Sequence, residues 1–547
     1  MAPPATVLRF LQDHSRALAF VLIAIACIRI VATYSELSIT VDEPGHFACG
    51  LEYLSKHVYR YESQHPPLTR AMEALGPYLD GARLLNADDR NREGMEVIFQ
   101  SPRPERALIL MRLGILPFFL LACLVVYFWS THHFGGDVAV IATGLFTLIP
   151  PVLAHAGLGT TDMGLAASVS AAFLALILWA ESPTPFRTIA LGVSSALAAL
   201  TKFTALGYVP ASAILALACV FVIPAARTAR VFIWARDRIG SFLVAVLIGA
   251  VTIWSAYWFS FGTVPAWNIR LPAPEFFDGI SVALHHNVEG HQNYLMGEVS
   301  NKGWWYYFPI VLAVKTPIGF LILVAIGIVY TIRAWANVRI LLPLAFALGI
   351  LVPAMTSNVN IGVRHILPIY CGLSIIAAFA VTQIIRTARS AAIVSVLAIL
   401  ILWTALSGAT HHPDYLSYFN GFAGGEPQNV LVDSDLDWGQ NTKRLAGRLR
   451  ELGVKEVSLH LVGPAAEAVD FEKWYGMPHV VRFNESYPNP GWNVVSVMQL
   501  SMRNEGVDLN LLRQGITKSW AYQIAPTERL GPLLLFNIPA DFKQRPQ

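Results

Sequence analysis

Long apolar stretches separated by short polar turns dominate the first three quarters of the chain. Because a helix needs about 20 mostly apolar residues to cross a bilayer, this pattern predicts about eleven membrane-spanning helices. The tightest turn in the series lies around Lys202. The predicted spans cover residues 17–34, 107–128, 137–155, 163–180, 187–201, 203–223, 239–260, 307–332, 339–355, 366–385 and 391–410.

The pattern changes after residue 410, where apolar and polar residues mix over short distances. Alternating short strands and helices are typical of a small α/β domain. The fold class we predict is therefore an α-helical polytopic membrane protein, residues 1–410, with a small C-terminal α/β domain, residues 411–547. Within that domain we expect strands at 429–433, 455–462 and 493–498 and a helix at 439–452.

Basic residues sort the short loops into two sets. If the N-terminus is cytoplasmic, the inside loops are basic and the short outside turns hold almost no lysine or arginine, as the positive-inside rule requires. The long segments 35–106 and 261–306 and the tail then lie outside, so we expect a multi-pass protein of the plasma (inner) membrane with a periplasmic C-terminal domain. The basic residues of the inside loops are Arg187, Arg227, Arg230, Arg236, Arg238, Arg333, Arg339, Arg386 and Arg389.

Composition supports the prediction of a membrane protein and speaks against a nucleic-acid-binding protein. Of 547 residues, 55% are hydrophobic and 14% charged, against about 25% charged in soluble domains. The net charge is only +3 and the basic residues are scattered, so no nucleic-acid partner is indicated. The five cysteines form no CxxC pair, which favours buried thiols. No small-residue cleavage site follows the first apolar run, so we interpret 17–34 as a span rather than a cleaved signal.

Acidic residues stand where the outside segments meet the spans. Asp42 and Glu43 follow the first span, with His46 one turn later, and partial desolvation there could tune a carboxylate for general-base work. The alternative is a solvated helix N-terminus. Asp162 follows a short outside turn, where it either caps the next helix or faces a cavity beside Asp42. His65, Pro66 and Pro67 form a rigid turn before an amphipathic helix at 68–79.

Cations stand at the outer ends of three other spans. Lys202, Lys315 and Arg364 could each be snorkelling side chains when taken singly. Together they place three cations on the face that carries Asp42 and Asp162. Because His365 follows Arg364, the pair suggests an anion site with a bidentate donor and a second hydrogen-bond donor.

Two further groups contain residue types that can bind a metal ion. The histidines at 285, 286, 291, 411 and 412 have no HExxH or comparable spacing, which favours solvated or structural roles. The acidic string at 433–440 (DSDLDWGQ) lacks the glycine and the later glutamate of a calcium loop. We interpret it as a turn or helix cap before 439–452.

These motifs resemble those of bacterial C-type membrane glycosyltransferases, the group of protein O-mannosyltransferases and aminoarabinose transferases. The resemblance covers essentially the whole chain, and its HPPL and DxDLDWGQ strings are the most specific. The chain departs from the family in its short 261–306 loop, which has no room for the inserted domain of eukaryotic members, and in lacking a WWDYG string. The matching segments are Asp42-Glu43, His65-Pro66-Pro67-Leu68, Thr161-Asp162, Lys315-Thr316-Pro317, Gly362-Val363-Arg364-His365 and Asp433 through Gln440.

The resemblance implies a mannosyltransferase-like enzyme that takes its sugar from a polyprenyl phosphate at the membrane surface and inverts the anomeric carbon. Asp42 or Glu43 would deprotonate the acceptor, which is a protein, a lipid or a polysaccharide. Arg364, with His365, Lys202 or Lys315, would stabilise the departing lipid phosphate. Asp162 would position the acceptor or, with Asp42, bind a divalent cation (Mg²⁺ or Mn²⁺), since metal dependence varies within the family.

Two other classes of protein stay open from the sequence. A lipid or sugar transporter would also have many helices and buried charges, although it favours charges at mid-membrane and broken helices in paired halves. A non-catalytic cell-envelope assembly protein would use its tail to bind a partner and would not need Asp42.

Overall fold

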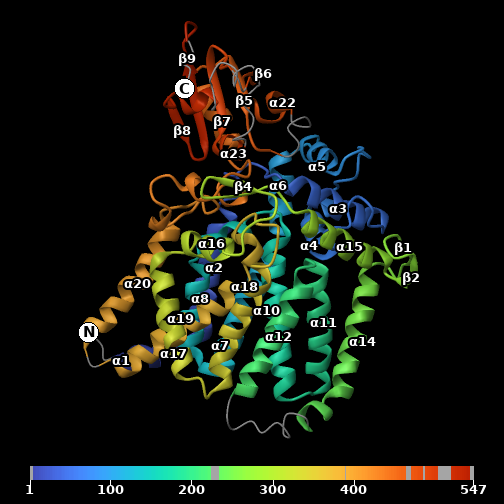
Figure 1. Ribbon diagram of the computed structural model, residues 1–547, viewed down its shortest axis with the longest axis vertical. Helices are drawn as coiled ribbons and strands as arrows, with labels where there is room; N and C mark the ends of the chain where they lie inside the picture. Colours follow the sequence, from blue (N-terminus) through green and yellow to red (C-terminus); the bar gives the residue numbers. More distant parts are fainter. Residues whose placement is uncertain are drawn as a thin grey trace.

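The structure is a computed structural model that describes residues 4–222, 233–388, 390–463, 470–484, 487–502 and 519–542. Arg227, Arg230 and Arg389 of the predicted basic loops lie outside these ranges. Helices form one bundle, and a β-sheet lies beyond one of its ends (Figure 1). We call that end, which also carries α3 (Glu43–Lys56) and α4 (Pro67–Leu79), the site end, and the opposite one the far end.

Apolar helices run between the two ends of the bundle (Figure 1). Most of them are hydrophobic around most of their circumference, as helices embedded in lipid and protein are, whereas α1 is amphipathic and α6 carries charged residues. Their bounds are α1 Pro4–Asp13, α2 Ser15–Val31, α6 Pro104–Leu113, α7 Leu116–Phe134, α8 Gly136–Thr147, α9 Pro150–Ala156, α10 Thr161–Glu181, α11 Pro185–Thr201, α12 Ala205–Val222, α14 Ile239–Ala256, α16 Tyr307–Lys315, α17 Ile318–Arg333, α18 Val338–Ala354, α19 Ile369–Thr387 and α20 Ala391–Ala409.

Length and composition make several of these helices able to span a membrane. Among the described residues, five are long and apolar enough, or up to seven if each of two bent pairs is one span. Four further apolar helices are shorter, with 10–17 residues. The predicted span 307–332 is broken between α16 and α17, because Pro317 has no N–H to continue the helix. The protein is thus mostly helical with several apolar helices that could span a membrane, and the count of eleven spans stays a prediction.

A layer of short elements covers the site end. It is built from the two predicted long segments and from η1, and the predicted amphipathic helix at 68–79 is confirmed as α4. α15 and the two hairpins come from the second segment (Figure 1). Beyond α3 and α4, the layer contains α5 Arg90–Phe99, β1 Phe261–Val264, β2 Ile269–Pro272, α15 Pro274–Glu289, β3 Asn293–Leu295, β4 Glu298–Ser300 and the 3-10 helix η1 Val363–Ile366.

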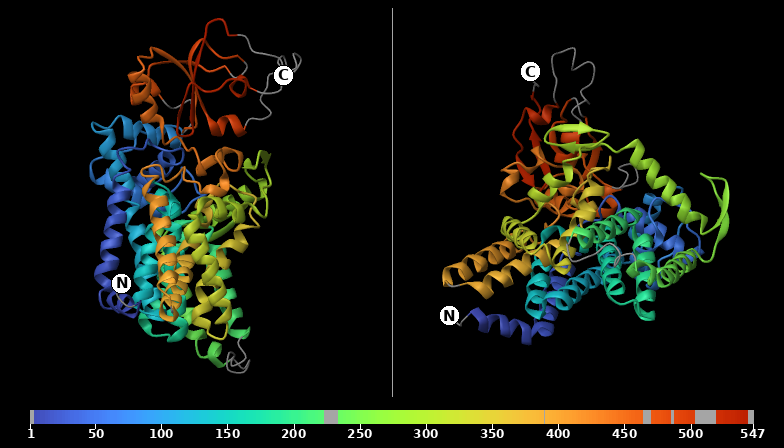
Figure 2. Two further views of the ribbon diagram at one scale, coloured as in Figure 1. Left: turned by 90° about the vertical axis from the view of Figure 1, so that its left-hand side faces the viewer. Right: turned by 60° about the horizontal axis from the view of Figure 1, so that its bottom comes forward.

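The tail folds into a mixed five-stranded sheet of order β6-β5-β7-β9-β8, which stands clear of the bundle (Figure 2). β5 pairs in parallel with β6 and β7, whereas β9 is antiparallel to β7 and β8. Its elements are η2 Gly421–Ala423, η3 Pro427–Asn429, η4 Asp433–Asp435, α21 Thr442–Glu451, β5 Glu456–His460, α22 Phe471–Tyr475, β6 His479–Arg482, β7 Gly491–Ser496, α23 Val497–Met502, η5 Trp520–Tyr522, β8 Glu528–Leu530 and β9 Leu533–Ile538.

Most of the predictions for this tail are confirmed, and one is wrong. Helix α21 and strand β5 lie within the predicted 439–452 and 455–462, and strand β7 overlaps the predicted 493–498. The expected strand at 429–433 is instead irregular chain between η3 and η4. Its apolar residues Leu431 and Val432 are 0% and 1% exposed. Leu431 is buried in the bundle's own core rather than in a sheet, which explains the misleading pattern.

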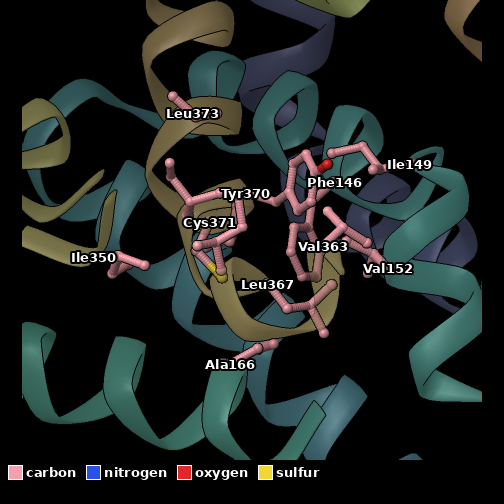
Figure 3. Packing of buried hydrophobic residues seen from close by; sticks show 14 of the residues in the cluster. Phe146, Ile149, Val152, Ala166, Ile350, Val363, Leu367, Tyr370, Cys371 and Leu373 are labelled. Atoms are coloured by element: carbon pink, nitrogen blue, oxygen red, sulfur yellow. The ribbon is translucent and has the colours of Figure 1, made fainter. Parts of the chain in front are cut away.

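The main core extends from the bundle up to the site end. Phe146, Val152, Val363, Leu367 and Tyr370 pack there against one another (Figure 3). Val363 belongs to η1 and Tyr370 opens α19, so this packing fixes the short segment that carries Arg364. Close packing of this kind leaves few alternative backbone positions for that segment.

Candidate functional site

Asp42 and Arg364 form an ion pair at the site end, although 322 residues separate them in the chain. Arg364 Nη1 lies 2.7 Å from Asp42 Oδ2. The arginine side chain is 9% exposed and the aspartate 32%, so Asp42 is the partner that faces solvent. Burial lowers the pKa of Arg364. The carboxylates of Asp42 and Asp162 raise it by more than burial lowers it, so the net shift is upward. The guanidinium therefore keeps its charge.

Asp162 and Lys202 form a second pair beside the first. Lys202 Nζ donates to Asp162 Oδ1 at 2.7 Å, and Asp162 Oδ2 lies 4.0 Å from Arg364 Nη1. Asp162 stands in the first turn of α10, but neither it nor Thr160 makes a side-chain capping bond there. The Asp162 carboxylate therefore does not cap α10. It contacts the same guanidinium that pairs with Asp42, and the predicted cavity beside Asp42 stays a prediction.

Glu43 adjoins Asp42 but faces the interior. It is 0% exposed and pairs with the equally buried Arg112, whose Nε and Nη2 lie 2.8 and 2.9 Å from its two oxygens. The N–H groups of Thr40 and Gly159 donate to the same carboxylate at 2.7 Å each. Every direction from which Glu43 could accept a proton is already filled by a donor, so its role is to hold the loop that presents Asp42.

The HPPL motif forms the start of α4 and a buried network around Arg70. Pro66 is extended and Pro67 opens the helix. Arg70 donates to Tyr59 Oη at 2.7 Å and to His46 Nδ1 at 2.9 Å, and it pairs with Glu62. The rings of His46 and His65 meet edge to face at 5.1 Å. Burial, followed by the charge of Arg70, lowers the pKa of His46, which keeps that imidazole neutral.

The acidic string at 433–440 connects the two loops of the site. Trp438 O accepts the N–H of Val41 at 3.1 Å, and the Asp435 carboxylate accepts the N–H of Val363 at 3.0 Å. The Arg364 guanidinium lies over the Trp438 ring at 4.3 Å. This segment is thus a buried clamp across the Asp42 and Arg364 loops. It contains the expected turn, η4, but none of its side chains caps α21, whose N-cap is Asn441.

Gly362 lets the clamp approach the arginine loop. Its φ is +118°, which side chains rarely tolerate. A Cβ at this position would lie 3.0 Å from Asp435 Oδ1 and from Ser434 Oγ. Glycine therefore meets two requirements at once, a positive φ and a close approach.

Lys315 and His365 are not brought to the carboxylates in the same way. Lys315 Nζ donates to the carbonyl oxygens of Leu416 and Asp435 at 2.7 and 2.6 Å, so it anchors the tail. The His365 ring lies parallel to the ring of Phe308, with centroids 6.3 Å apart, and its carbonyl accepts from Tyr208 Oη. Of the predicted phosphate-binding residues, Arg364 and Lys202 are therefore the two that pair with Asp42 and Asp162.

The residues at Asp42 and Asp162 do not fit a divalent cation. Each carboxylate already pairs with a cation, Arg364 or Lys202, and a metal ion between them would have to displace or face these charges. Among the described residues, two buried atoms at this place have no hydrogen-bond partner: Asp162 Oδ2 and Arg364 Nε. Buried polar atoms are nearly always bonded, so these two atoms leave one acceptor and one donor available beside the ion pairs.

Several residues of this site were missed in the sequence. Arg112, Glu62 and Arg70 carry the buried networks, and a lone arginine inside an apolar run was the available signal for Arg112. Glu73 on α4 is 0% exposed, and neither carboxyl oxygen has a partner within the described ranges. Burial raises the pKa of Glu73, which favours its neutral form.

Comparison with known proteins shows which solved folds the chain resembles. No protein-family model matches the chain, and no curated protein sequence does. Among solved structures, the fold is similar to that of ArnT, a membrane protein crystallised with and without undecaprenyl phosphate.

The similar structures include two of ArnT from Cupriavidus metallidurans. ArnT bound to undecaprenyl phosphate matches with a TM-score of 0.52 at 13% identity, over 94% of this chain and 97% of that one. The apo state matches with a TM-score of 0.50 at 13% identity, over 87% and 92%. A weaker match, at 0.44 and 12% identity over 97% and 75%, is the oligosaccharyltransferase AglB from Archaeoglobus fulgidus in complex with an inhibitory peptide and a dolichol-phosphate.

Proposed function

We propose that this protein transfers a sugar from a polyprenyl phosphate to an acceptor, with inversion, at the extracytoplasmic face of the membrane. The observation that carries the proposal is the pair of ion pairs Asp42–Arg364 and Asp162–Lys202, joined by a contact of 4.0 Å. A base and an anion-binding cation side by side are what displacement of a phosphate leaving group needs. The shared fold with undecaprenyl-phosphate-bound ArnT supports a lipid-linked donor.

In the proposed topology the site end faces the periplasm. The five long helices, the two bent pairs and the four shorter apolar helices would cross the membrane, and residues 411–547 would form an extracytoplasmic domain. Arg187, Arg238 and Arg339 lie at the far end, where positive residues favour the cytoplasm. A lipid donor can then stay in the bilayer while its sugar reaches Asp42.

In the proposed reaction, the Asp42 carboxylate takes the proton of the acceptor hydroxyl. The acceptor oxygen attacks the anomeric carbon, and the bond from that carbon to the phosphate oxygen breaks. The electron pair of that bond stays on the polyprenyl phosphate, whose charge Arg364 and Lys202 stabilise. Arg364 can do so while paired with Asp42, because its Nε is unpartnered among the described residues.

Transfer from defined donors by the purified protein in lipid nanodiscs tests this proposal. The donors are undecaprenyl phosphates that carry radiolabelled mannose, glucose or aminoarabinose, and the acceptor is a membrane extract. We expect one donor to be consumed by the wild type and by Asp80→Asn, but not by Asp42→Asn. Asp80 is a matched control because it also pairs with an arginine, Arg106, at 2.8 Å but on the exposed surface.

The same purified protein separates the three classes of protein when closed vesicles are added to measure transport and a pull-down from the extract is added to measure partner binding. Donor that crosses the bilayer unchanged, with or without Asp42, would identify a transporter instead. A folded wild type that consumes no donor, with a tail that still retains a partner from the extract, would identify a non-catalytic assembly protein. Equal transfer by wild type and Asp42→Asn would refute the role of Asp42 as the base.

A further inference from the structure

Three metal-ligating side chains converge at the far end of the bundle. His132 Nε2 lies 2.7 Å from Glu181 Oε2, and His133 Nε2 lies 3.3 Å from Glu181 Oε1. The three ligand atoms all lie within 4.8 Å of one another. In the part of the chain that the structure describes, this is the one group of three or more such residues with that spacing.

We propose that His132, His133 and Glu181 form a binding site for a zinc-class divalent cation, separate from the transfer site. Two imidazoles and one carboxylate are a ligand set that zinc uses, with a water molecule in the fourth position. The site has room for that water, since His132 is 38% and Glu181 27% exposed, whereas the His133 side chain is buried. The ion would enter from the aqueous phase at the membrane surface.

Packing of the two helices holds the ligands in place. His132 and His133 end α7, and Glu181 ends α10. One level deeper, the fully buried Trp129 of α7 packs against Phe173 of α10 with ring centroids 5.5 Å apart. A metal ion would therefore join two ends that already lie side by side. α10 also carries Asp162 in its first turn, about 30 Å away at the site end.

Arg339 is the competitor for the proposed ion. Its Nε lies 3.9 Å from Glu181 Oε1, and its side chain is 63% exposed. An exposed arginine contributes little to such a pair and can turn away into solvent. Removal of this positive charge should tighten cation binding, because a cation beside Glu181 repels the incoming ion.

Zinc binding by the full-length protein tests the proposal. The protein is purified without a polyhistidine tag, treated with a chelator, placed in nanodiscs and titrated with ZnCl₂ by calorimetry. We expect a single saturable ion that raises the melting temperature, and at least tenfold weaker binding in His132→Ala and in Glu181→Gln. Arg339→Ala should bind several times more tightly. His285→Ala is the matched control, since His285 also pairs with a glutamate, Glu289, at 3.0 Å on an exposed helix.

The zinc-binding results either establish the site or overturn it. Loss of binding in His132→Ala with full binding in His285→Ala would establish the site. The proposal is overturned if the wild type binds no more zinc than Glu181→Gln, or if His285→Ala loses the ion while His132→Ala keeps it. Because His132 is partly exposed, His132→Ala should stay folded, and size-exclusion chromatography checks this.

Discussion

Several charged pairs at the two ends of the bundle lie in opposite surroundings. At the site end, the partners of Glu43–Arg112 and Asp162–Lys202 have side chains that are 10% exposed or less. At the far end, Arg236 and Arg339 are 73% and 63% exposed. Burying a charge costs several kcal/mol even when it is paired, whereas an exposed pair costs and contributes little.

This difference indicates what each end is for. A hydrophobic contact of similar volume often stabilises a protein as well as a buried ion pair does, so stability alone does not explain the pairs at the site end. Their arrangement around an unpartnered acceptor and donor, Asp162 Oδ2 and Arg364 Nε, fits binding and chemistry instead. The exposed arginines of the far end, Arg236 and Arg339, fit the simpler task of orienting the helices in the membrane.

The largest expected effect belongs to Arg364. We expect Arg364→Ala to lower sugar transfer about 10³-fold, because the variant loses the cation that faces the departing phosphate. The matched variant Arg106→Ala removes an exposed arginine that also pairs with an aspartate, and it should transfer normally. Initial rates in nanodiscs measure both. Transfer by Arg364→Ala within threefold of the wild type would mean that this buried pair is structural.

The pair at Glu62 should show its effect in stability rather than in chemistry. Burial raises the pKa of Glu62. Its neighbours Arg70, His65 and Arg90 lower it by more than burial raises it, so the net shift is downward. Such a carboxylate stabilises the fold above its unfolded pKa, near 4.3, and this contribution disappears as the pH falls below that value. Glu62→Gln should therefore cost about 3 kcal/mol at pH 7.

Thermal unfolding at several pH values measures this prediction. The difference between wild type and Glu62→Gln should be constant from pH 7 to about pH 5 and should narrow at lower pH. Glu96→Gln, in which an exposed pair with Arg92 is broken, should differ from the wild type by less than about 1 kcal/mol at every pH. A Glu62→Gln difference that is the same at pH 7 and pH 3.5 would contradict the assigned ionisation.

The sequence predicts which residues lie at the site end better than it predicts their partners. Asp42, Asp162, Lys202 and Arg364 each stand at the end of an apolar run, so the sequence alone indicated a shared face. Which partners meet depends on packing between distant segments. Arg112 finds Glu43 across 69 positions, and Lys315 finds two backbone carbonyls of the tail, which carry no side-chain signature.

The clamp shows the same limit. The alternating acids of 433–440 have the local pattern of a turn, yet Asp435 and Asp437 are 1% exposed. Hydrogen bonds from outside the segment offset the cost of burying these carboxylates. The N–H of Val363 donates to Asp435, and the hydroxyl of Ser496 donates to Asp437. Local propensity could not reveal these partners, because they belong to other parts of the fold.

Trp438 should have an intermediate effect. Its ring lies under the Arg364 guanidinium, so Trp438→Ala should free the arginine and lower the transfer rate about tenfold, as expected for a cation–π contact of 1–2 kcal/mol. Trp438→Phe keeps an aromatic face and should restore most of the rate. Two results would show that the ring does not position Arg364. One is a Trp438→Ala variant with a raised KM and an unchanged kcat, and the other is an equal loss of transfer rate in Trp438→Ala and Trp438→Phe.

The smallest effect is expected at the far end. Arg236 is 73% exposed and lies 3.7 Å from Asp237, a pair that water screens almost completely. Arg236→Ala should change the free energy of unfolding by less than about 0.5 kcal/mol and leave transfer unchanged. Its charge should matter only during insertion, where several basic residues act together. Melting curves and initial rates beside those of Arg364→Ala test this directly. A loss of transfer in Arg236→Ala comparable to that in Arg364→Ala would mean that the far end takes part in the reaction, and the contrast between the two ends would have to be abandoned.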